Sequence, residues 1–566
     1  MPRAPVPYIL RLQPPAALYR ALTTGAMRAQ GETLQDSERR AVAEYLSGRK
    51  LNEQSDLEPP LCGADIGFDA KAPPAFPGWG LTPENTRYVS TAAAGIGRAN
   101  VGQLKLQWAV GFAGATRARS EPAIAGGALI VGSADGTIYA LDLASGCKRW
   151  VFQVGSEVRT GVVVSPWVAG DATAQPLAYF GDVVGNLYAV NARTGALAWR
   201  DRADLHPSTT LTAAPVLHDG LLYQAVSSLE EGAADGTHEC CTFRGSLIAY
   251  DARTGERRWQ TFMTEPPTQR GKDTNGRPKW GPSGVALWNS PAIDTQRGLL
   301  YIATGDNYSD PVTAMSDAVV AMDLKTGKIR WVYQATANDG WNVSCIAPDR
   351  ANCPESAGPD FDFGASPILM QATNGKQYVL AGQKSGTAYA IDPDTGQLVW
   401  KHKVGRGGIM AGIYFGMAAG DDRVYVPVND AADGQTYDFP DSPGLYALDL
   451  HTGAFVWKQP YTDAACAGRG PACGPGINAA VTATDQLVFA GAGDGWLRAH
   501  DAATGALLWS FDTAGEFKTV GGGLARGGSM GGGAGPVLSN GYLIMPSGYG
   551  FAGRMPGNVM LVFKVQ

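Results

Sequence analysis

The sequence predicts an all-β fold, an eight-bladed β-propeller, and three observations carry that prediction. A hairpin motif recurs along most of the chain, strand-like segments stand at both ends of the repeat region, and the composition is rich in turn residues, with 74 glycines and 36 prolines among 566 residues. Internal repeats indicate a repeat architecture before any local pattern is considered. Abundant glycine and proline favour many turns between short strands.

The repeated motif is Ala-x-Asp-x-x-Thr-Gly-x-x-x-Trp, with a single substitution in each of two copies. The copies are ALDLASGCKRW at 140–150, AVNARTGALAW at 189–199, AYDARTGERRW at 249–259, AMDLKTGKIRW at 321–331, AIDPDTGQLVW at 390–400, ALDLHTGAFVW at 447–457 and AHDAATGALLW at 499–509. The aspartate can accept hydrogen bonds from the following amides and start a turn, and glycine permits positive φ. The tryptophan on the next strand is large enough to pack between neighbouring sheets. Each copy therefore predicts one blade.

An eighth blade is split between the two ends of the repeat region. LKLQW at 104–108 carries a tryptophan strand without a preceding partner, and VMLVFKV at 559–565 is a strand without a following one. Joining the two closes the ring and covers exposed sheet edges. Before the propeller, DSERRAVAEYLSG at 36–48 predicts a short helix, capped by Asp36 or Ser37 and ended by Gly48.

Charge and cysteine usage narrow the class of protein. The net charge of −6 and the lack of a basic tract argue against a nucleic-acid partner, and no apolar run is long enough to span a membrane. The eight cysteines include two close pairs, Cys345 with Cys353 and Cys466 with Cys473, beside the adjacent Cys240 and Cys241. This clustering suits an oxidising compartment; the alternative is a set of buried thiols in a cytosolic protein.

The seven motifs resemble the tryptophan-docking repeats of alcohol dehydrogenases that depend on pyrroloquinoline quinone (PQQ), over about 100–566. ECCTFRGSL at 239–247 and GPDFDFGASP at 358–367 are similar to features of the cytochrome-type polyvinyl-alcohol dehydrogenases within that family. The resemblance implies an enzyme that oxidises alcohols, with PQQ and Ca²⁺ or a lanthanide as cofactors.

The N-terminal piece LTTGAMRAQGETLQDSERRAVAEYLSG resembles the last part of a cytochrome c domain, with Met27 at the place of the axial haem ligand. The chain contains no Cys-x-x-Cys-His, so covalent haem is predicted to be absent and Met27 to be a packed side chain. We therefore expect a truncated chain or a gene that lost its haem-binding half. The expected division is a cytochrome-like remnant at 1–50, a linker at 51–85 and the propeller at 86–566.

PQQ is a flat polyanionic quinone, so its site needs an aromatic platform, cations for its carboxylates and a Lewis acid. The resemblance implies that Trp288 is the platform, that Lys384 contacts the quinone oxygens, that the Thr212 hydroxyl bonds the cofactor and that Arg159 holds a carboxylate. The alternatives are ordinary packing for Trp288 and a solvated turn for Lys384.

Calcium and lanthanides prefer oxygen ligands. The resemblance places a metal ligand at Asp306 in ATGDN, with Asn307 beside it, and a second at Glu230 in VSSLEEG, where Glu231 or Glu239 could substitute. A polar turn is the alternative for the first motif.

The alcohol must lose its hydroxyl proton, which calls for a carboxylate beside the metal. The family motif resembles His-Asp-x-Trp-Asp with the last aspartate as base, but this chain has Asn342 at that position of NDGWN, and an amide cannot accept the proton. Asp339 is the favoured base; Asp306 as base and loss of turnover are the alternatives.

Cys240 and Cys241 are adjacent, with Cα atoms about 3.8 Å apart across a trans peptide, so a bridge between them would be strained and points to a special role. Methanol dehydrogenases place such a bridge over the quinone, although their pair lies one blade earlier. The alternative is that the two thiols pair elsewhere or remain reduced.

The sequence as a whole predicts a periplasmic quinoprotein that oxidises secondary alcohols, polymeric ones such as polyvinyl alcohol included, and passes electrons to a separate cytochrome c. One rival is a non-catalytic propeller scaffold, or a degenerate quinoprotein that binds PQQ without turnover, because fold does not determine function. Another rival is a quinoprotein that acts on sugars or other polyols.

Overall fold

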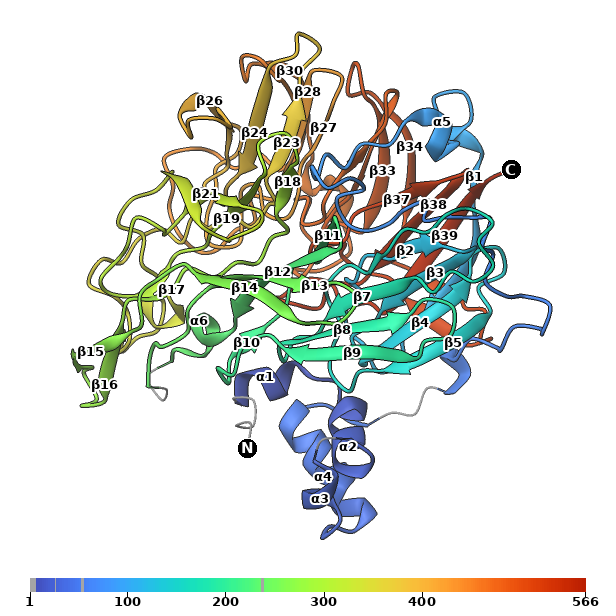
Figure 1. The fold of residues 1–566 in the computed structure, drawn as a ribbon, viewed down its shortest axis with the longest axis horizontal. Coiled ribbons are helices and arrows are strands. Elements are labelled where there is room, and N and C mark those ends of the chain that lie inside the picture. Colours follow the sequence, from blue (N-terminus) through green and yellow to red (C-terminus); the bar gives the residue numbers. More distant parts are fainter. Residues whose placement is uncertain (1–6, 26, 52–54, 236–238) are drawn as a thin grey trace.

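The computed structural model describes residues 7–25, 27–51, 55–235 and 239–566. Eight antiparallel sheets form a ring, which confirms the predicted eight-bladed propeller (Figure 1). The first blade contains β2 (Ala123–Ala125), β3 (Ala128–Gly132), β4 (Thr137–Asp142) and β5 (Lys148–Gln153), and the second contains β6 (Val163–Val164), β7 (Leu177–Gly181), β8 (Asn186–Asn191) and β9 (Leu197–Arg202). The third contains β11 (Val216–His218), β12 (Leu221–Ser228), β13 (Ser246–Asp251) and β14 (Arg257–Phe262), with β10 (Thr209–Thr210) beside β12. The fourth contains β18 (Ala292–Asp294), β19 (Leu299–Ala303), β21 (Ala318–Asp323) and β22 (Ile329–Gln334).

The next three blades follow the same order. They are β23 (Ile368–Gln371), β24 (Gln377–Gly382), β25 (Thr387–Ile391) and β26 (Leu398–Lys403); β27 (Ala418–Gly420), β28 (Arg423–Val428), β29 (Gly444–Asp449) and β30 (Phe455–Pro460); and β31 (Thr482–Ala483), β32 (Leu487–Gly491), β33 (Trp496–Asp501) and β34 (Leu507–Asp512). Smaller two-stranded sheets are β15 (Thr268–Lys272) with β16 (Pro278–Gly281), β17 (Ser283–Gly284) with β20 (Asn307–Ser309), and β35 (Glu516–Lys518) with β36 (Leu524–Arg526).

The eighth blade joins the two ends of the repeat region, as the sequence predicts. It contains β37 (Val537–Ser539), β38 (Tyr542–Ser547), β39 (Val559–Val565) and β1 (Leu104–Gly111). Strand β1 pairs with β39 from Leu104 opposite Val565 to Gly111 opposite Val559. The ring is therefore closed by hydrogen bonds between segments more than 400 residues apart.

Tryptophan docking joins consecutive blades. In each of seven contacts, the indole ring of the tryptophan lies over the motif glycine of the next blade. The indole Nε1–H donates to a carbonyl of that blade, with N···O distances of 2.8–3.1 Å. Trp400 shows the geometry: it donates to the Leu450 carbonyl at 2.8 Å and lies over Gly453, which has φ +71°. Trp509 instead packs edge-on against Phe563 of β39, at 5.7 Å between ring centroids.

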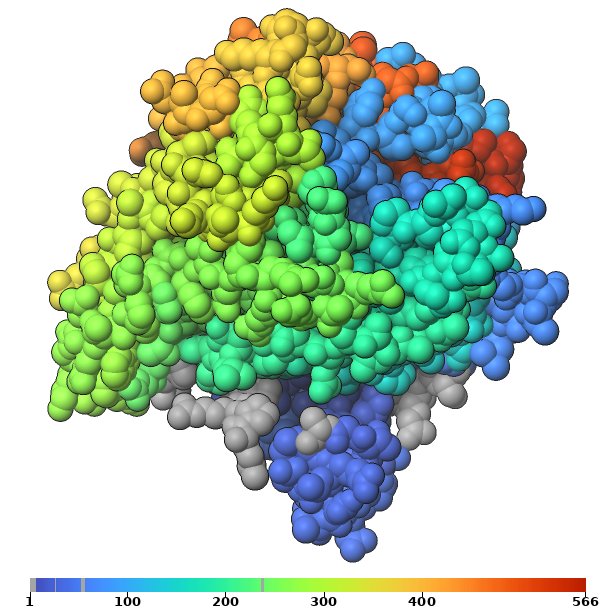
Figure 2. All heavy atoms as spheres, in the orientation of Figure 1, coloured from blue at the N-terminus to red at the C-terminus, as the bar shows by residue number. Residues whose placement is uncertain are grey.

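The N-terminal residues form helices outside the ring. They are α1 (Pro7–Leu12), α2 (Pro15–Thr23), α3 (Arg28–Gly31) and α4 (Asp36–Ser47), and Figure 2 shows them as a blue projection from the propeller body. Gly48 ends α4 with φ +66°, as expected, but the helix cap is Gln35, whose N–H donates to Glu38 at 2.7 Å. Met27 is 39% exposed, so the expectation that it is packed is wrong. Two further short helices are α5 (Thr91–Ala94) and α6 (Glu230–Ala233).

The segment expected to be only a linker reaches the centre of the ring. Backbone amides of Val164, Ile293, Leu369 and Ala419 donate to carbonyls of residues 77–86, at 2.8–3.0 Å. Arg87, which is fully buried, pairs with Glu121 at 3.0 Å. This segment therefore ties several blades together instead of only connecting two parts of the chain.

Disulfides pair all eight cysteines. The pairs are Cys62–Cys147, Cys240–Cys241, Cys345–Cys353 and Cys466–Cys473. Within the described residues, no helix is long and apolar enough to cross a membrane.

Replacing the docking glycine tests the contact that repeats around the ring. A Cβ at position 453 would lie 2.6 Å from the Trp400 ring, whereas Gly220 has a similar φ of +74° and no atom within 4 Å of its Cβ position. We expect Gly220→Ala to lower the free energy of unfolding by about 1–2 kcal/mol through backbone strain, and Gly453→Ala to lower it by at least about 1 kcal/mol more through overpacking. Urea denaturation measures both, and equal losses would contradict the docking account.

Candidate active site

Two adjoining cavities lie among the loops that connect the blades. The larger has a volume of about 190 Å³, and both are lined by Arg159, Thr212, Trp288 and Phe415. The larger one is also lined by Glu231, Asp360, Asp362 and Lys384, so charged groups of both signs face one space. The four residues predicted for PQQ, Trp288, Lys384, Thr212 and Arg159, are thus brought together although they are spread over 226 residues of sequence.

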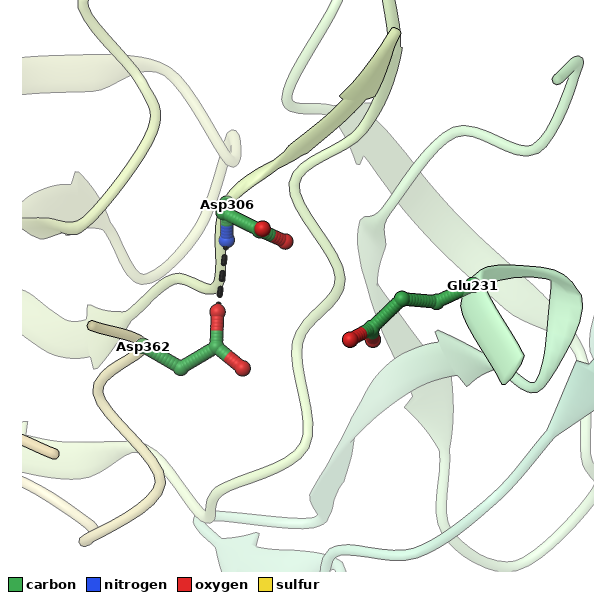
Figure 3. Close-up of side chains that lie close together, drawn as sticks. All are labelled: Glu231, Asp306 and Asp362. Carbon is green, nitrogen blue, oxygen red and sulfur yellow. Dashed lines mark hydrogen bonds between the residues drawn. The ribbon is translucent and has the colours of Figure 1, made fainter. Parts of the chain in front are cut away.

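Three carboxylates converge beside this cavity. Glu231 extends from α6, Asp306 lies between β19 and β20, and Asp362 comes from the segment before β23 (Figure 3). Each contributes an oxygen, and these oxygens all lie within 4.8 Å of one another. Three oxygens at such distances can coordinate one hard cation.

Asp306 is the member of this cluster whose charge is least compensated. Its backbone N–H donates to the Asp362 carboxylate at 2.7 Å, but neither of its own carboxylate oxygens has a donor in the described part of the chain. The side chain is fully buried. Burial and the neighbouring charges of Asp362 and Glu231 raise the pKa of Asp306 well above its usual value. A buried carboxylate without a partner is costly, so this arrangement fits a bound cation.

Lys384 supplies positive charge beside the cluster. Its Nζ pairs with the Asp360 carboxylate and lies 3.3 Å from Asp362. Burial opposes the charge of Lys384, but Asp360 and Asp362 outweigh it, and the pKa of Lys384 is raised well above its usual value. Burial and the charge of Asp362 raise the pKa of Glu231 to about 8, although Lys384 opposes the rise. One lysine therefore does not offset the whole group of carboxyls, and the raised pKa values of Asp306 and Glu231 show that their negative charge is not compensated by the protein alone.

Two of the predicted metal ligands lie outside the cluster. The Glu230 carboxylate accepts the backbone N–H groups of Thr242 at 3.0 Å and Phe243 at 2.8 Å. The Asn307 amide donates to the Ser283 carbonyl at 2.8 Å and accepts from the Thr313 N–H at 2.8 Å. Both side chains are thus occupied by backbone groups. The structure favours Glu231, which the sequence left as a substitute.

The aromatic platform is held from its edges. Trp288 is half-buried and meets Tyr414 and Phe415 edge-on, at 5.7 and 5.8 Å between ring centroids. A Cβ at Gly364 would lie 2.1 Å from the Trp288 ring, so a residue with a side chain could not stand there without moving it. Trp288 lines both cavities, so part of the indole is accessible to a ligand there.

Two arginines, Arg119 and Arg159, bring positive charge to the smaller cavity. Burial and the repulsion of Arg119 lower the pKa of Arg159 to about 9, a value that leaves it charged at neutral pH. The Arg159 Nε, the Arg119 Nη1 and the Thr212 Oγ1 are buried and have no partner in the described residues. Unpaired donors of this kind fit an anionic ligand that accepts their hydrogen bonds.

The predicted base, Asp339, lies behind the cavity wall. Its carboxylate accepts the N–H groups of Asp360 at 3.0 Å and Phe361 at 2.9 Å, and it is not among the described residues that line the larger cavity. Burial raises the pKa of Asp339, and these two donors oppose the rise. Asp339 therefore holds the turn that presents Asp360, which does line the cavity.

Asn342 has a structural role in this fold. Its amide donates to the carbonyls of Tyr308 at 2.9 Å and Asn352 at 2.8 Å, and its oxygen accepts the Ser344 N–H at 2.9 Å. A carboxylate could not donate to the two carbonyls. The asparagine at this position is thus required by the backbone around it and is no sign of a lost base.

Cys240 and Cys241 form a vicinal disulfide. The pair is buried in an apolar cluster with Phe243 and Tyr308, against which Trp288 packs. Neither cysteine is among the described residues that line the two cavities, so the predicted contact with the cofactor is not seen in this geometry.

The sequence analysis missed Asp360 and Asp362 as site residues. Both lie in GPDFDFGASP, and the signal that could have revealed them is their spacing. Two aspartates two positions apart suggest carboxylates that act together, although Asp360 has φ +61° and the segment is therefore not a regular strand in which alternate residues share one face.

Comparison with known families identifies the class. A family model described as the β-propeller domain of glucose/ethanol/alcohol dehydrogenases, the PQQ family, matches residues 76–406. A second model, for the outer membrane protein assembly factor BamB, matches residues 384–550. Because the first match covers more than half of the chain, the chain belongs to the PQQ family of dehydrogenase propellers.

Two proteins with similar sequences align over the whole length of this chain. A polyvinylalcohol dehydrogenase from a Pseudomonas species is 36% identical, over 100% of this chain and 90% of that protein. The polyvinylalcohol dehydrogenase of Sphingopyxis sp. (strain 113P3) is 34% identical with the same coverage. Among solved structures, the quinohemoprotein alcohol dehydrogenase of Comamonas testosteroni superposes with a TM-score of 0.62 at 21% identity, covering 88% of this chain and 81% of that one, which shows the shared fold.

Removing the unpartnered carboxylate tests whether the cluster binds a cation. We expect Asp306→Asn to leave the metal-free protein as stable as the wild type or more so, because the variant relieves a buried charge without a partner. Calcium at one hundred times its dissociation constant should stabilise the wild type by about 2.7 kcal/mol, and this gain should vanish in the variant. Thermal unfolding with and without Ca²⁺ measures it.

Glu230→Gln is the matched control for that experiment. Its carboxylate holds backbone amides outside the cluster. The variant should therefore lose stability but keep the full increase in melting temperature with Ca²⁺. A full Ca²⁺ response in Asp306→Asn would show that the cluster is not the metal site.

Proposed function

We propose that the chain is a PQQ-dependent alcohol dehydrogenase that oxidises secondary alcohols, polymeric ones such as polyvinyl alcohol included. The observation that carries the proposal is the set of groups that share one space. Arg159, with an unpartnered nitrogen, and Trp288 line the larger cavity. Glu231 and Asp362 line it as well, and they lie beside the unpartnered carboxylate of Asp306. A flat anionic quinone with a cation at one end satisfies both unpartnered groups. The names of the two relatives at 36% and 34% identity support the choice of substrate.

The proposed location is the periplasm, and the proposed electron acceptor is a separate cytochrome c. The four disulfides support an oxidising compartment. An alcohol gives up two electrons, so a dehydrogenase of this kind needs a carrier to return its cofactor to the oxidised state.

The residues present fit both cofactors. Glu231, Asp306 and Asp362 would hold Ca²⁺ or a lanthanide, Trp288 would lie against the quinone, and Arg159 would bind a carboxylate. When bound, PQQ supplies the acceptor for hydride and the cation supplies a Lewis acid.

Side chains of the protein itself would accept the hydroxyl proton of the alcohol. Asp360 faces the cavity and would accept the hydroxyl proton as hydride leaves the alcohol carbon. Burial raises the pKa of Asp360 well above its usual value, and the ammonium of Lys384, which pairs with Asp360, opposes the rise. Asp339 keeps the Asp360 turn in place through two amide hydrogen bonds. We thus propose Asp360, in preference to Asp339, as the base.

The scaffold alternative explains less of the structure. An interaction module has no need of a buried carboxylate cluster beside a lysine, since burying such charge without a ligand costs stability. The degenerate alternative depended on Asn342, and the hydrogen bonds of that side chain give it a structural role in this fold.

Reconstitution of the purified chain tests the proposed function. The chain is mixed with PQQ and Ca²⁺, the absorbance of the quinone is followed, and dye reduction is measured with 2-propanol, sorbitol and polyvinyl alcohol. The proposal expects quinone binding and reduction that depends on the secondary alcohols. Binding without turnover would leave a degenerate quinoprotein, preference for sorbitol would favour the polyol alternative, and absence of binding would favour the scaffold.

Two substitutions separate the base from the residue that positions it. Asp360→Asn should lower kcat by about 10²–10⁴-fold, the range for loss of a general base, while KM and quinone binding stay close to wild type. Asp339→Asn should lower kcat less and also reduce thermal stability, because it loses one acceptor for the amides of the Asp360 turn. Near-normal kcat in Asp360→Asn, with inactive but stable Asp339→Asn, would assign the base to Asp339.

A further inference from the structure

The N-terminal helix α1 forms part of the wall of the larger cavity. Tyr8, which precedes the first propeller strand by almost a hundred residues, lines the same space as Glu231, Trp288 and Lys384. Its side chain is half-buried, with the cavity on one side. The helices that project from the ring in Figures 1 and 2 are therefore joined to the site through α1.

The Tyr8 ring rests on α6, the helix that carries Glu231. A Cβ at Gly232 would lie 3.2 Å from the Cε1, Cζ and hydroxyl oxygen of Tyr8. Burial and the charge of Glu231 raise the pKa of the Tyr8 phenol, so the group stays neutral and adds no charge to an already acidic site. Tyr8 therefore places a rigid, uncharged ring beside the carboxylates.

Several contacts hold α1 in this position from behind. Ile9 is fully buried, and the Leu12 carbonyl accepts from Arg117 Nη2 at 2.5 Å. The Gln13 Oε1 accepts from the Ser156 hydroxyl at 3.2 Å and from the Glu157 N–H at 3.3 Å. The Gln13 carbonyl also accepts from Arg49 Nη2 at 2.6 Å. These bonds connect α1 to the propeller, so the propeller sets the position of the Tyr8 side chain.

We propose that Tyr8 determines specificity by limiting the branching next to the carbinol of the alcohol that reaches Glu231 and Asp360, so that an unbranched chain enters and a branched one is excluded. The inference rests on the proposed function, because it concerns the substrate of that same cavity. A phenyl ring with rigid support excludes bulky groups by contact, and pockets discriminate substrates through such contacts. The hydroxyl contributes little to the exclusion, since the ring supplies the bulk.

The test compares a small and a branched secondary alcohol, 2-propanol and 2,4-dimethyl-3-pentanol, on the full chain loaded with PQQ and Ca²⁺. Tyr8→Ala should raise the ratio of kcat/KM for 2,4-dimethyl-3-pentanol over 2-propanol at least tenfold, and Tyr8→Phe should keep the ratio within twofold of wild type. Gln13→Ala, which loosens the support of α1 but retains the ring, should raise the ratio less than Tyr8→Ala. Tyr45→Ala is the control, because Tyr45 lies on α4 and is 86% exposed. An unchanged ratio in Tyr8→Ala would overturn the proposal.

A second readout does not depend on turnover. If Tyr8 restricts the mouth of the cavity, PQQ should leave the Tyr8→Ala protein at least tenfold faster than it leaves the wild type, as followed by quinone absorbance after dilution. If no variant oxidises any alcohol, the proposed function fails, and the release rate alone decides about Tyr8. Equal release rates from wild type and Tyr8→Ala would then contradict its role at the mouth.

Discussion

A cluster of buried carboxyl groups without enough partners is the constraint on which the rest of the site depends. Glu231, Asp306 and Asp362 share one small region, and Asp306 has no hydrogen-bond donor for its carboxylate in the described residues. Charges of this kind are stable only when they are paired or coordinate a metal. Lys384 pairs with a carboxylate beside them, and the arginines and Trp288 line the adjoining cavities. Together these residues form a site suited to a cation and an anionic, flat ligand.

The ring makes this arrangement possible because it converts distant sequence into one rigid frame. Each docked tryptophan locks a blade to the next through one hydrogen bond and one glycine contact, and β1 closes the ring against β39. The site residues stand on loops and strand ends of this frame, which is where rigid scaffolds place functional groups. The segment around Arg87 adds a further connection between blades from the inside.

The fold could be predicted from sequence because docking leaves a local signature, a glycine and a tryptophan at constant spacing in seven of the eight blades. The site could be predicted only in part. Choosing Glu231 over Glu230 requires the orientation of α6, since neighbouring helical residues point about 100° apart. Asn342 and Asp339 bond backbone groups from other segments, which spacing does not reveal. Tyr8 reaches Gly232 through packing across more than 200 residues, a contact without any local pattern.

The most direct test of the central claim is an anomalous-scattering map from crystals of the full chain grown with PQQ and a lanthanide ion. The account predicts one strong peak bounded by the carboxylates of Glu231, Asp306 and Asp362, with flat density for the quinone against the Trp288 ring. Quinone density elsewhere, or no peak among the three carboxylates while the lanthanide binds another site, would contradict it.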